Sequence, residues 1–168
     1  DLSKIPGGSK VELQARADRG WHFKNWVVNG TAQDEAAAKT NGTYTISELA
    51  GDLSIRAEFA QSDSYTAKAT AAAGNGTVKY TLYDIYGDEI ETKTMPTEGV
   101  TIYKDEEIIF HAAPKTGYQV EQWEVNGKKT AGNSKTNPEG TIRADKNITA
   151  TVYFKVTASY QLTFGTVG

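Results

Sequence analysis

Two histidines and one group of acidic residues are the side chains of this sequence whose types are suited to catalysis or metal binding. His22 and His111 could form a proton-transfer pair or a pair of metal ligands, because imidazole titrates near neutral pH. They occupy non-equivalent positions, so we interpret them as ordinary surface or edge histidines. The acidic group could hold Ca²⁺, since hard cations prefer several converging carboxylate oxygens. Its members are Asp84, Asp88, Glu89 and Glu91. Their spacing is not that of a calcium loop, so we interpret the group as a solvated charged segment.

The sequence lacks the residue patterns of common catalytic sites. No Gly-x-Ser-x-Gly or His-Glu-x-x-His run is present. The chain has no cysteine, which excludes thiolate nucleophiles, cysteine metal sites and disulfides. The run Gly74-Asn75-Gly76 is not followed by a predicted helix, so we interpret it as a turn rather than a phosphate cradle. We therefore expect a protein that is not an enzyme, with no catalytic, cofactor-binding or metal-binding residues and no cofactor.

Charge and hydropathy argue against two kinds of partner. The formal net charge is -3 and the sequence pI is about 5.4, so the chain has no basic surface for nucleic acid. No apolar run approaches the roughly 18 residues that a membrane span requires. We expect neither nucleic-acid binding nor direct membrane insertion.

An internal repeat organises the chain. GWHFKNWVVNG at residues 20–30 recurs 97 residues later as GYQVEQWEVNG at residues 117–127. DLSIRAEF at residues 52–59 recurs 95 residues later as NITATVYF at residues 147–154. Both pairs keep their aromatic and apolar positions. The sequence is therefore a tandem array with a period near 95 residues.

The repeat predicts three segments. Residues 1–61 are a first repeat that lacks its opening strands, residues 62–157 are a complete second repeat, and residues 158–168 begin a third, in which SYQLTF matches the SYTAKA of residues 64–69. We therefore expect the chain to be a piece of a longer repetitive protein. Incomplete units expose strand edges, so we also expect the third segment to pair with the first repeat of a neighbouring copy.

Alternating apolar and polar residues predict a mainly β structure. The runs VELQA, IIFHA, LSIRAEF and ITATVYF have the period of two that is typical of half-buried strands. Asn-Gly pairs indicate turns, since both residues tolerate a positive φ. These pairs are Asn29-Gly30, Asn41-Gly42, Asn75-Gly76 and Asn126-Gly127. Those at Asn75 and Asn126 most resemble hairpin turns.

One segment departs from the strand pattern. TAQDEAAAK, from Thr31 to Lys39, begins with a threonine suited to an N-cap, continues with acids and alanines, and ends with a lysine. This order predicts a short helix in the first repeat. The second repeat has the polar run KKTAGNSKTNP at the same place, so we interpret the connection as a variable loop.

The aromatic residues of the repeated stretch fit either a core strand or a ligand-stacking surface. Trp21 and Phe23 share one strand parity, whereas Trp26 has the other. Either the strand is covered on both faces, or a bulge near Lys24-Asn25 and Glu121-Gln122 changes the phase, and we favour the bulge. Both alternatives bury the second tryptophan of the stretch.

We favour core packing for these aromatic residues, because burying one aromatic side chain removes ~150 to 250 Å² from water. The residues expected to anchor the cores are Trp26, Trp123, Phe59, Phe154 and Tyr118. They are structural predictions and not predictions of a ligand site.

The order of motifs in residues 64–157 resembles the divergent internalin-type B-repeat of bacterial surface proteins. It combines G-x-G-x-V at Gly74–Val78, A-x-P-x-x-G-Y-x-x-x-x-W at Ala112–Trp123 and D-K-x-I-T-A-x-x-x-F at Asp145–Phe154. Two departures are Ala17, where the family pattern has proline, and an insertion at Tyr83–Gly99. The resemblance implies tandem small antiparallel β modules, β-grasp-like or sandwich-like, without catalytic residues.

The same resemblance implies an extracellular protein, secreted or on the bacterial cell surface, in which the repeats act as a stalk or an adhesive segment. Neighbouring repeats of the same chain are then the main partners. The alternative is a module that binds a glycan or a host protein. Its candidate contacts are the loops Thr31–Thr40 and Lys128–Pro138 and the side chains of Tyr83 and Tyr86, which we expect to be exposed. An enzyme, the third alternative, would require a pocket with converging titratable groups.

Overall fold

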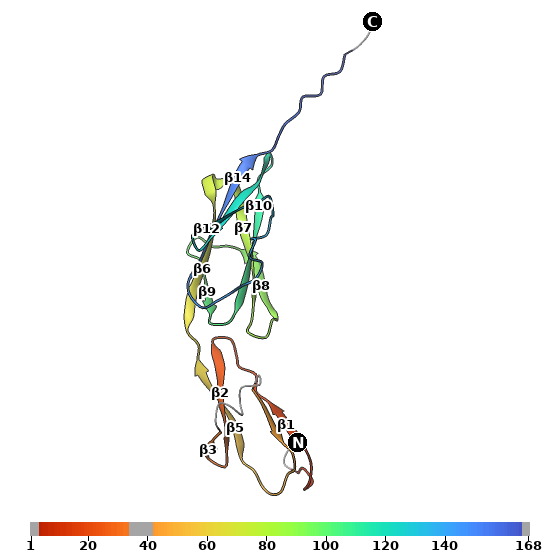
Figure 1. Ribbon diagram of the computed structural model, residues 1–168, viewed down its shortest axis with the longest axis vertical. Helices are drawn as coiled ribbons and strands as arrows, with labels where there is room; N and C mark the ends of the chain where they lie inside the picture. Colours follow the sequence, from red (N-terminus) through yellow and green to blue (C-terminus); the bar gives the residue numbers. More distant parts are fainter. Residues whose placement is uncertain (1–3, 34–41, 166–168) are drawn as a thin grey trace. The chain divides into compact units, whose positions relative to one another are not determined.

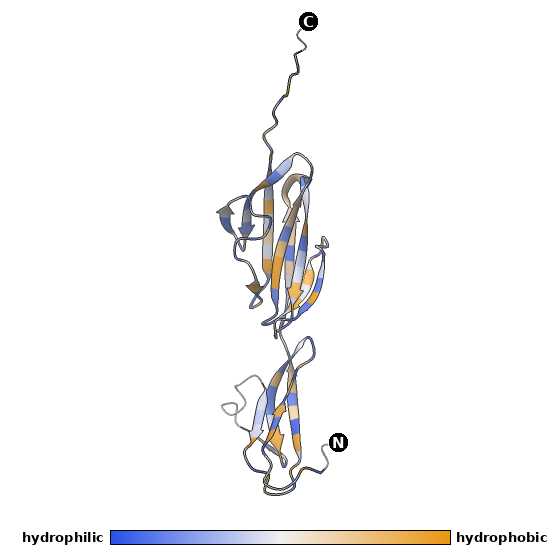
Figure 2. Cartoon of the chain, turned by 90° about the vertical axis from the view of Figure 1, so that its right-hand side faces the viewer, coloured by the Kyte–Doolittle hydropathy of each residue, from blue (hydrophilic) through white to orange (hydrophobic). Residues whose placement is uncertain are grey.

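The computed structural model describes residues 4–33 and 42–165 of the 168-residue chain. These residues form fourteen β-strands and one 3₁₀ turn (Figure 1), which confirms the predicted mainly β class. The chain divides into two units, residues 1–63 and 64–168. Apolar and polar residues alternate along many of the strands (Figure 2), as the sequence pattern predicts.

The first unit contains two small sheets. Strand β1 (Val11–Gln14) pairs antiparallel with β4 (Thr43–Ile46). Strand β2 (Trp21–Val28) is the centre of a three-stranded sheet, between β3 (Thr31–Ala32) and β5 (Ile55–Gln61). All three pairings are antiparallel.

The core of the first unit surrounds Trp26. The described residues that are buried in it are Ala15 and Trp26, and five side chains pack against them while partly exposed. The ring of Trp26 lies 5.7 Å from that of Phe23 and 5.9 Å from that of Tyr44, measured between centroids. Side chains from both sheets of the first unit therefore contact the indole of Trp26.

The second unit contains a sheet of five strands and a sheet of four. The five-stranded sheet has the order β12-β11-β14-β6-β9, and the four-stranded sheet has the order β13-β10-β7-β8. The strands of the first sheet are β6 (Ser64–Ala71), β9 (Val100–Tyr103), β11 (Tyr118–Val125), β12 (Lys128–Ala131) and β14 (Ile148–Val156). Those of the second are β7 (Gly76–Tyr83), β8 (Glu89–Thr94), β10 (Glu107–Pro114) and β13 (Ile142–Arg143).

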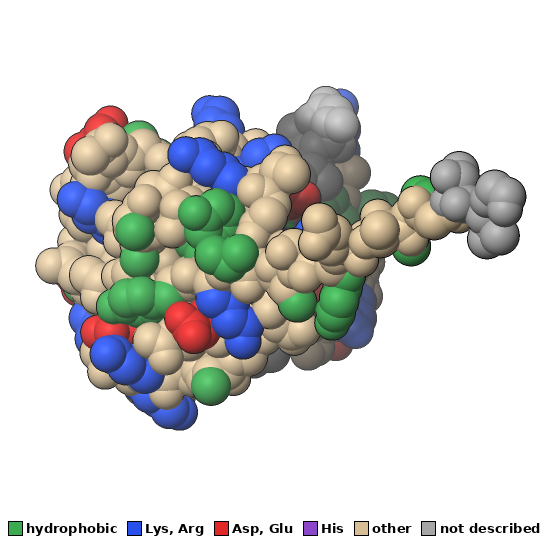
Figure 3. Space-filling model, turned by 90° about the horizontal axis from the view of Figure 1, so that it is seen from above, with side chains coloured by type: hydrophobic (Ala, Val, Ile, Leu, Met, Phe, Trp, Pro, Cys, Tyr) green, Lys and Arg blue, Asp and Glu red, His purple; other side chains and the backbone are tan. Residues whose placement is uncertain are grey.

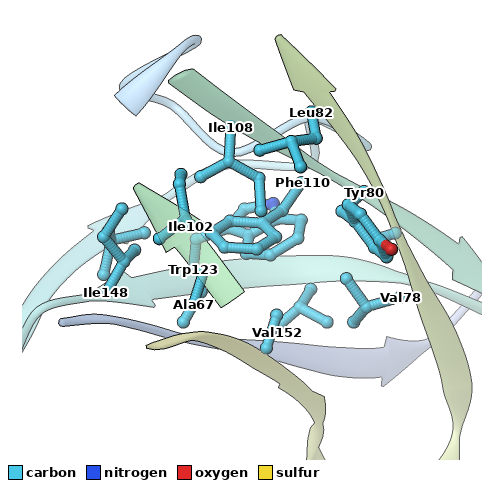
Figure 4. Packing of buried hydrophobic residues seen from close by; sticks show 14 of the residues in the cluster. Ala67, Val78, Tyr80, Leu82, Ile102, Ile108, Phe110, Trp123, Ile148 and Val152 are labelled. Atoms are coloured by element: carbon cyan, nitrogen blue, oxygen red, sulfur yellow. The ribbon is translucent and has the colours of Figure 1, made fainter. Parts of the chain in front are cut away.

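These two sheets enclose one apolar core, so the second unit is a sandwich. Trp123 and Ile102 from the first sheet pack with Phe110, Leu82 and Tyr80 from the second (Figure 4). A β-grasp arrangement would need a helix across a sheet, and residues 64–165 form none apart from the short 3₁₀ turn at Ala72–Gly74. One strand pair also departs from the expected antiparallel modules, because β6 runs parallel to β14.

The internal repeat is preserved as a repeat of strands. The antiparallel pair β2–β5 of the first unit has the same register as β11–β14 of the second: Trp26 lies opposite Ala57, and Trp123 lies opposite Val152. Both pairs contain a register shift, between Phe23 and Asn25 in the first and between Val120 and Gln122 in the second. The predicted bulge is confirmed at both sites. It explains how Phe23 and Trp26 reach one core despite their opposite parity.

Of the four predicted Asn-Gly turns, two follow the prediction, one does not, and Asn41 of the fourth lies outside the described residues. Asn126-Gly127 joins β11 to β12, and Asn29-Gly30 joins β2 to β3, each as a two-residue hairpin turn with both φ angles positive. Asn75 is different: it lies between β6 and β7, which belong to different sheets. The hairpin predicted at Asn75 is therefore wrong, because the chain crosses there from one sheet to the other.

The predicted helix of the first repeat begins where the structure has a strand. Thr31 and Ala32 form β3, since the Asn29-Gly30 turn brings them beside Val28 and Val27 of β2. Thr31 is therefore not a helix N-cap. Its pairing with β2 outweighs the helix preference of the local sequence. The remainder of the helix prediction falls on residues 34–41, which lie outside the described residues.

Residues 158–165 follow β14 without entering a strand or a turn. No helix among the described residues has the length and apolar character needed to cross a membrane. Figure 3 shows the segment leaving the second unit, with apolar side chains along it.

Candidate functional site

The histidines lie in different units and each has a local hydrogen-bond partner. His22 Nδ1 lies 3.2 Å from the hydroxyl of Ser62, and His111 Nε2 lies 3.2 Å from the hydroxyl of Thr81. In each case the histidine and its partner belong to neighbouring strands, or to a residue that directly follows such a strand. The structure therefore does not bring the two imidazoles into one constellation within either unit.

Three of the four acidic residues of the insertion have carboxylates that bond within the β7–β8 hairpin. Asp84 Oδ1 accepts hydrogen bonds from the backbone N–H groups of Tyr86 and Asp88, both at 2.9 Å. Glu89 accepts one from the hydroxyl of Thr92 at 2.8 Å. Glu91 accepts one from the phenol of Tyr80 and forms an ion pair with Lys93.

These contacts hold the carboxylates of Asp84, Glu89 and Glu91 within the hairpin itself. Across the described part of the chain, no group of three or more His, Cys, Asp or Glu residues is arranged to hold a metal ion. Gly74-Asn75-Gly76 closes the 3₁₀ turn Ala72–Gly74 and opens a strand, and the residues that follow it, 77–165, contain no helix whose N-terminus could support a phosphate.

The expected core anchors differ in burial. Trp26 and Trp123 are buried, with 5% and 1% of their surface exposed. Phe154 is partly buried and packs against the core of the second unit. Tyr118 is partly buried at the start of β11.

Phe59 is 38% exposed, more than the other predicted anchors. Its counterpart Phe154 is covered because its ring lies against the backbone of Gly76, where an added Cβ would meet Phe154 Cζ at 2.6 Å. The described residues of the first unit have no counterpart of β7 to cover Phe59. Phe59 is therefore less covered than Phe154, and its ring contacts that of Phe23 at 6.1 Å between centroids.

The second predicted contact loop, Lys128–Pro138, is mostly exposed but is tied to the core by hydrogen bonds. Lys128–Ala131 is the strand β12, which pairs with β11. Trp123 Nε1 donates a hydrogen bond to the carbonyl of Ser134 at 3.0 Å. Ala112 N donates to the carbonyl of Lys135 at 2.6 Å, so the loop is bonded to a strand of each sheet.

The side chain of Asn137 holds the same loop in place. It is 2% exposed. Its Oδ1 accepts a hydrogen bond from Phe110 N at 2.7 Å, and its Nδ2 donates one to the carbonyl of Gly140 at 2.8 Å. The sequence analysis did not single out Asn137, although an Asn-Pro pair in a polar loop is a known turn signal.

The insertion presents the exposed apolar residues that lie closest to the predicted tyrosines. Ile85, Tyr86 and Ile90 are exposed at the β7–β8 hairpin, and we call them the hairpin patch. Tyr83 is only partly exposed, because it lies on β7 between β10 and β8. Tyr83 is therefore less exposed than predicted, whereas the side chain of Tyr86 is exposed.

A local irregularity explains the exposure of Ile90. The pairing of β7 with β8 shifts register between Leu82, which lies opposite Glu91, and Tyr83, which lies opposite Glu89. Ile90 is the extra residue of this bulge, and a bulge redirects its side chain. The sequence analysis missed Ile85 and Ile90, whose signal was apolar character within a charged insertion.

The arrangement defines a class of protein. Two all-β units repeat one strand plan, one bulge and one buried tryptophan, and the candidate contacts lie on a loop insertion. The chain belongs to the family of the divergent InlB B-repeat domain, whose model matches residues 3–63 and 65–158. This confirms the resemblance inferred from the motifs, and the family indicates a repeat module of bacterial surface proteins. Comparisons with curated proteins and with solved structures gave no match.

Proposed function

We propose that this chain is a non-enzymatic spacer segment of an extracellular bacterial surface protein, in which each repeat is a self-supporting link. The observation that carries the proposal is the recurrence of one strand plan with a separate core in each unit. Trp26 is buried with residues of the first unit, and Trp123 with residues of the second. A protein built from such links gains length by repetition, and each link contacts chiefly its neighbours.

The connection between the units supports the same proposal. Strand β5 ends at Gln61 and β6 begins at Ser64, so two residues join one unit to the next. A short connection limits the conformations available between consecutive links. Long flexible linkers would instead be expected if the repeats were independent adhesive heads.

Small-angle X-ray scattering on chains of increasing length tests the spacer function. One or two further copies of residues 64–157 are inserted after residue 157 of the whole chain. A spacer gains a constant increment of maximum dimension for each inserted copy. A dimension that grows only as the cube root of mass, as in a compact assembly, would contradict the proposal.

A second candidate function is protein binding through the hairpin patch. The patch presents Ile85, Tyr86 and Ile90 on a turn that Asp84 ties with two hydrogen bonds, so little ordering is needed on binding. A single tyrosine between aliphatic side chains suits an apolar protein contact better than a sugar-stacking platform. The surrounding Asp84, Asp88 and Glu89 favour a basic rim on the partner.

Arrays of host surface proteins and of glycans test this candidate. The whole chain is compared with a Tyr86→Ser, Ile90→Ser double variant and with Val156→Ser, which replaces an exposed apolar residue of the same unit outside the hairpin. Binding to a basic protein that is lost only in the double variant is the expected result. Signals on the glycan array alone, or equal binding by all three chains, would reject this candidate.

A further inference from the structure

Strand β8 leaves one edge of its sheet open, inside the second unit and away from both ends of the sequence. It is the outer strand of the order β13-β10-β7-β8, and among the described residues it pairs only with β7 (Figure 1). The other outer strands of this unit, β9, β12 and β13, have four, four and two residues. With six residues, β8 offers the longest open edge within residues 64–165, and such edges accept further strands.

The hydrogen-bond pattern shows which backbone groups face this open edge. Met95 N donates to the carbonyl of Val78 at 2.9 Å, which makes these residues a hydrogen-bonded pair of the β7–β8 ladder. In an antiparallel ladder such pairs alternate with pairs whose N–H and C=O groups point away from each other. The register puts Thr92 and Thr94 at the alternate positions. Their backbone groups therefore point to the open side, and no described residue bonds to them.

Side chains hold β8 in place on both of its faces. Thr92 Oγ1 lies 2.8 Å from Thr81 Oγ1 of β7. On the other face, Glu91 accepts a hydrogen bond from the phenol of Tyr80 and forms an ion pair with Lys93. The edge is thus ordered by its own unit, so little conformational entropy is lost when another strand pairs with it.

The charges of β8 are arranged symmetrically about Thr92. Glu91 precedes this residue and Lys93 follows it. When a second β8 is placed antiparallel with Thr92 opposite Thr92, Glu91 of each copy faces Lys93 of the other. Because the backbones of Glu91 and Lys93 bond to β7, these charge pairs occupy non-hydrogen-bonded positions, where side chains are closest. Opposite charges at such positions stabilise a strand pair.

Other pairings of two β8 strands lose this complementarity. An antiparallel pairing centred on Lys93 or on Glu91 puts two like charges opposite each other, and one centred on Thr94 loses both charge pairs. A parallel pairing in register puts each charged residue beside its own copy. Like charges directly opposite destabilise a sheet. The charges therefore specify both the direction and the register of a second copy.

We propose that two copies of this chain pair through β8, antiparallel and with Thr92 at the centre, to form one continuous sheet. The arrangement has a two-fold axis, as in most homodimers, and the two central threonines exchange two backbone hydrogen bonds. The bulge at Ile90 lies outside the central residues 91–93. This pairing goes beyond the spacer function, because a spacer sets length, whereas the β8 edge joins two spacers side by side.

The size of the contact sets the expected strength of the pairing. The strand contributes six residues from each copy, fewer than the roughly 20 to 30 a side of a standard stable interface. We therefore expect a weak dimer that forms at high protein concentration, and the experiments below are chosen to detect one.

Cysteine cross-linking tests the register, since the chain has no cysteine of its own. In the proposed dimer the two Thr92 Cα atoms are about 5.5 Å apart, within the range that a disulfide spans. The two Thr94 Cα atoms are roughly 13 Å apart along the ladder, because each lies four residues from its own copy. Under mild oxidation Thr92→Cys should form disulfide-linked dimers on the order of tenfold faster than Thr94→Cys, an exposed residue on the same face of β8. Equal rates for the two variants would overturn the proposal.

Charge variants test the pairing of Glu91 with Lys93 by sedimentation velocity over a range of concentrations. Lys93→Glu turns both charge pairs into pairs of carboxylates, and we expect it to abolish the dimers of the unaltered chain. Lys104→Glu makes the same change in net charge at an exposed lysine outside β8 and should leave the dimers unchanged. Glu91→Lys should also be monomeric alone. An equimolar mixture of Glu91→Lys and Lys93→Glu should dimerise again, because each copy then meets opposite charges.

Two results would refute pairing through β8: a monomeric mass for the unaltered chain at every concentration, and dimers that survive in Lys93→Glu. Folding is not at stake in that variant, because the Lys93 side chain is 65% exposed. Glu91→Lys removes the acceptor of the Tyr80 phenol, so circular dichroism first checks that it folds. If it does not fold, the comparison of Lys93→Glu with Lys104→Glu decides. Neither refuting result affects the spacer function, which rests on the separate cores of the two units.

Discussion

The indole N–H of Trp123 donates a hydrogen bond of 3.0 Å to the backbone carbonyl of Ser134. This contact joins a buried residue of the sandwich core to the loop of residues 132–138. The N–H of a buried indole usually has such a partner. The loop of residues 132–138 is consequently a structural part of the second unit, although its polar sequence is that of a surface connection.

Replacing Trp123 by alanine should destabilise the second unit by about 3 to 5 kcal/mol, because a large buried side chain and its hydrogen bond are both lost. Urea unfolding followed by far-ultraviolet circular dichroism measures this change. Trp21→Ala is the matched control, because the Trp21 side chain is exposed and should cost less than about 1 kcal/mol.

The same Trp123→Ala variant should leave the first unit intact. The two units have separate cores, so amide protection in β2 and β5 is expected to stay unchanged while protection in β11 and β14 falls. Hydrogen exchange resolved by residue checks this. Loss of protection in both units together would show that they fold as one body and would weaken the spacer proposal.

Asn137→Ala should cost about 1 to 3 kcal/mol, since it leaves the buried N–H of Phe110 without its side-chain acceptor. Asn133→Ala changes an exposed asparagine of the same loop and should stay within about 0.5 kcal/mol of the unaltered chain. Thermal unfolding of the two variants under identical conditions makes the comparison. Similar losses in both would mean that Asn137 does not hold the loop.

Gly76→Ala should destabilise the second unit by about 1 to 3 kcal/mol through overpacking. The added Cβ would lie 2.6 Å from Phe154 Cζ and 2.7 Å from the carbonyl oxygen of Ala113, and the second of these is backbone that yields little. Gly51→Ala has open space around the new Cβ and should be neutral or slightly stabilising. Chemical denaturation of both variants tests whether only Gly76→Ala lowers the free energy of unfolding. An unaffected Gly76→Ala chain would contradict the close packing of β7 against Phe154.

Glu58 should lose its contribution to stability as the solution becomes acidic. The hydrogen bond from Arg56, 2.8 Å long, and the charge of the same guanidinium lower the pKa of Glu58 in the folded chain. A lowered folded pKa gives a contribution that is complete above the unfolded value of about 4.3 and disappears as pH falls through the folded value. The effect is small, because the pair is on the surface.

Carbon-detected NMR titration of the Glu58 carboxyl checks this assignment. Arg56→Gln should raise the pKa of Glu58 toward its ordinary value, whereas Arg143→Gln, a change to a surface ion pair of the second unit, should not. If both variants titrate like the unaltered chain at Glu58, another group lowers its pKa.

Much of the strand arrangement could be predicted from the sequence, because it depends on local signals that occur twice. The alternation of residues 52–59 and 147–154 predicted β5 and β14. The parity conflict between Phe23 and Trp26 predicted the bulge, and Asn126-Gly127 predicted a hairpin turn. Each of these features involves neighbouring residues, whose preferences are expressed in almost any surrounding.

Contacts between distant segments were not predictable in the same way. Phe59 and Phe154 occupy one repeat position, yet only Phe154 is covered, because β7 lies against it. Asn75-Gly76 has the sequence of a hairpin turn but connects two sheets. Thr31 begins a stretch of helix-forming residues but pairs with Val28 of β2. In each case the partner comes from another part of the chain.

The sequence alone therefore determined the repeat, the strands and their inward faces, together with the family to which they belong. The tertiary structure decided which of the equivalent residues are buried and how the loop of residues 132–138 is bonded to Trp123. It also decided where apolar surface stays exposed, at the hairpin patch and along β5. The physical reason is that a side chain's burial depends on the strand or loop that lies over it. That covering segment is brought there by long-range pairing, which no local pattern encodes.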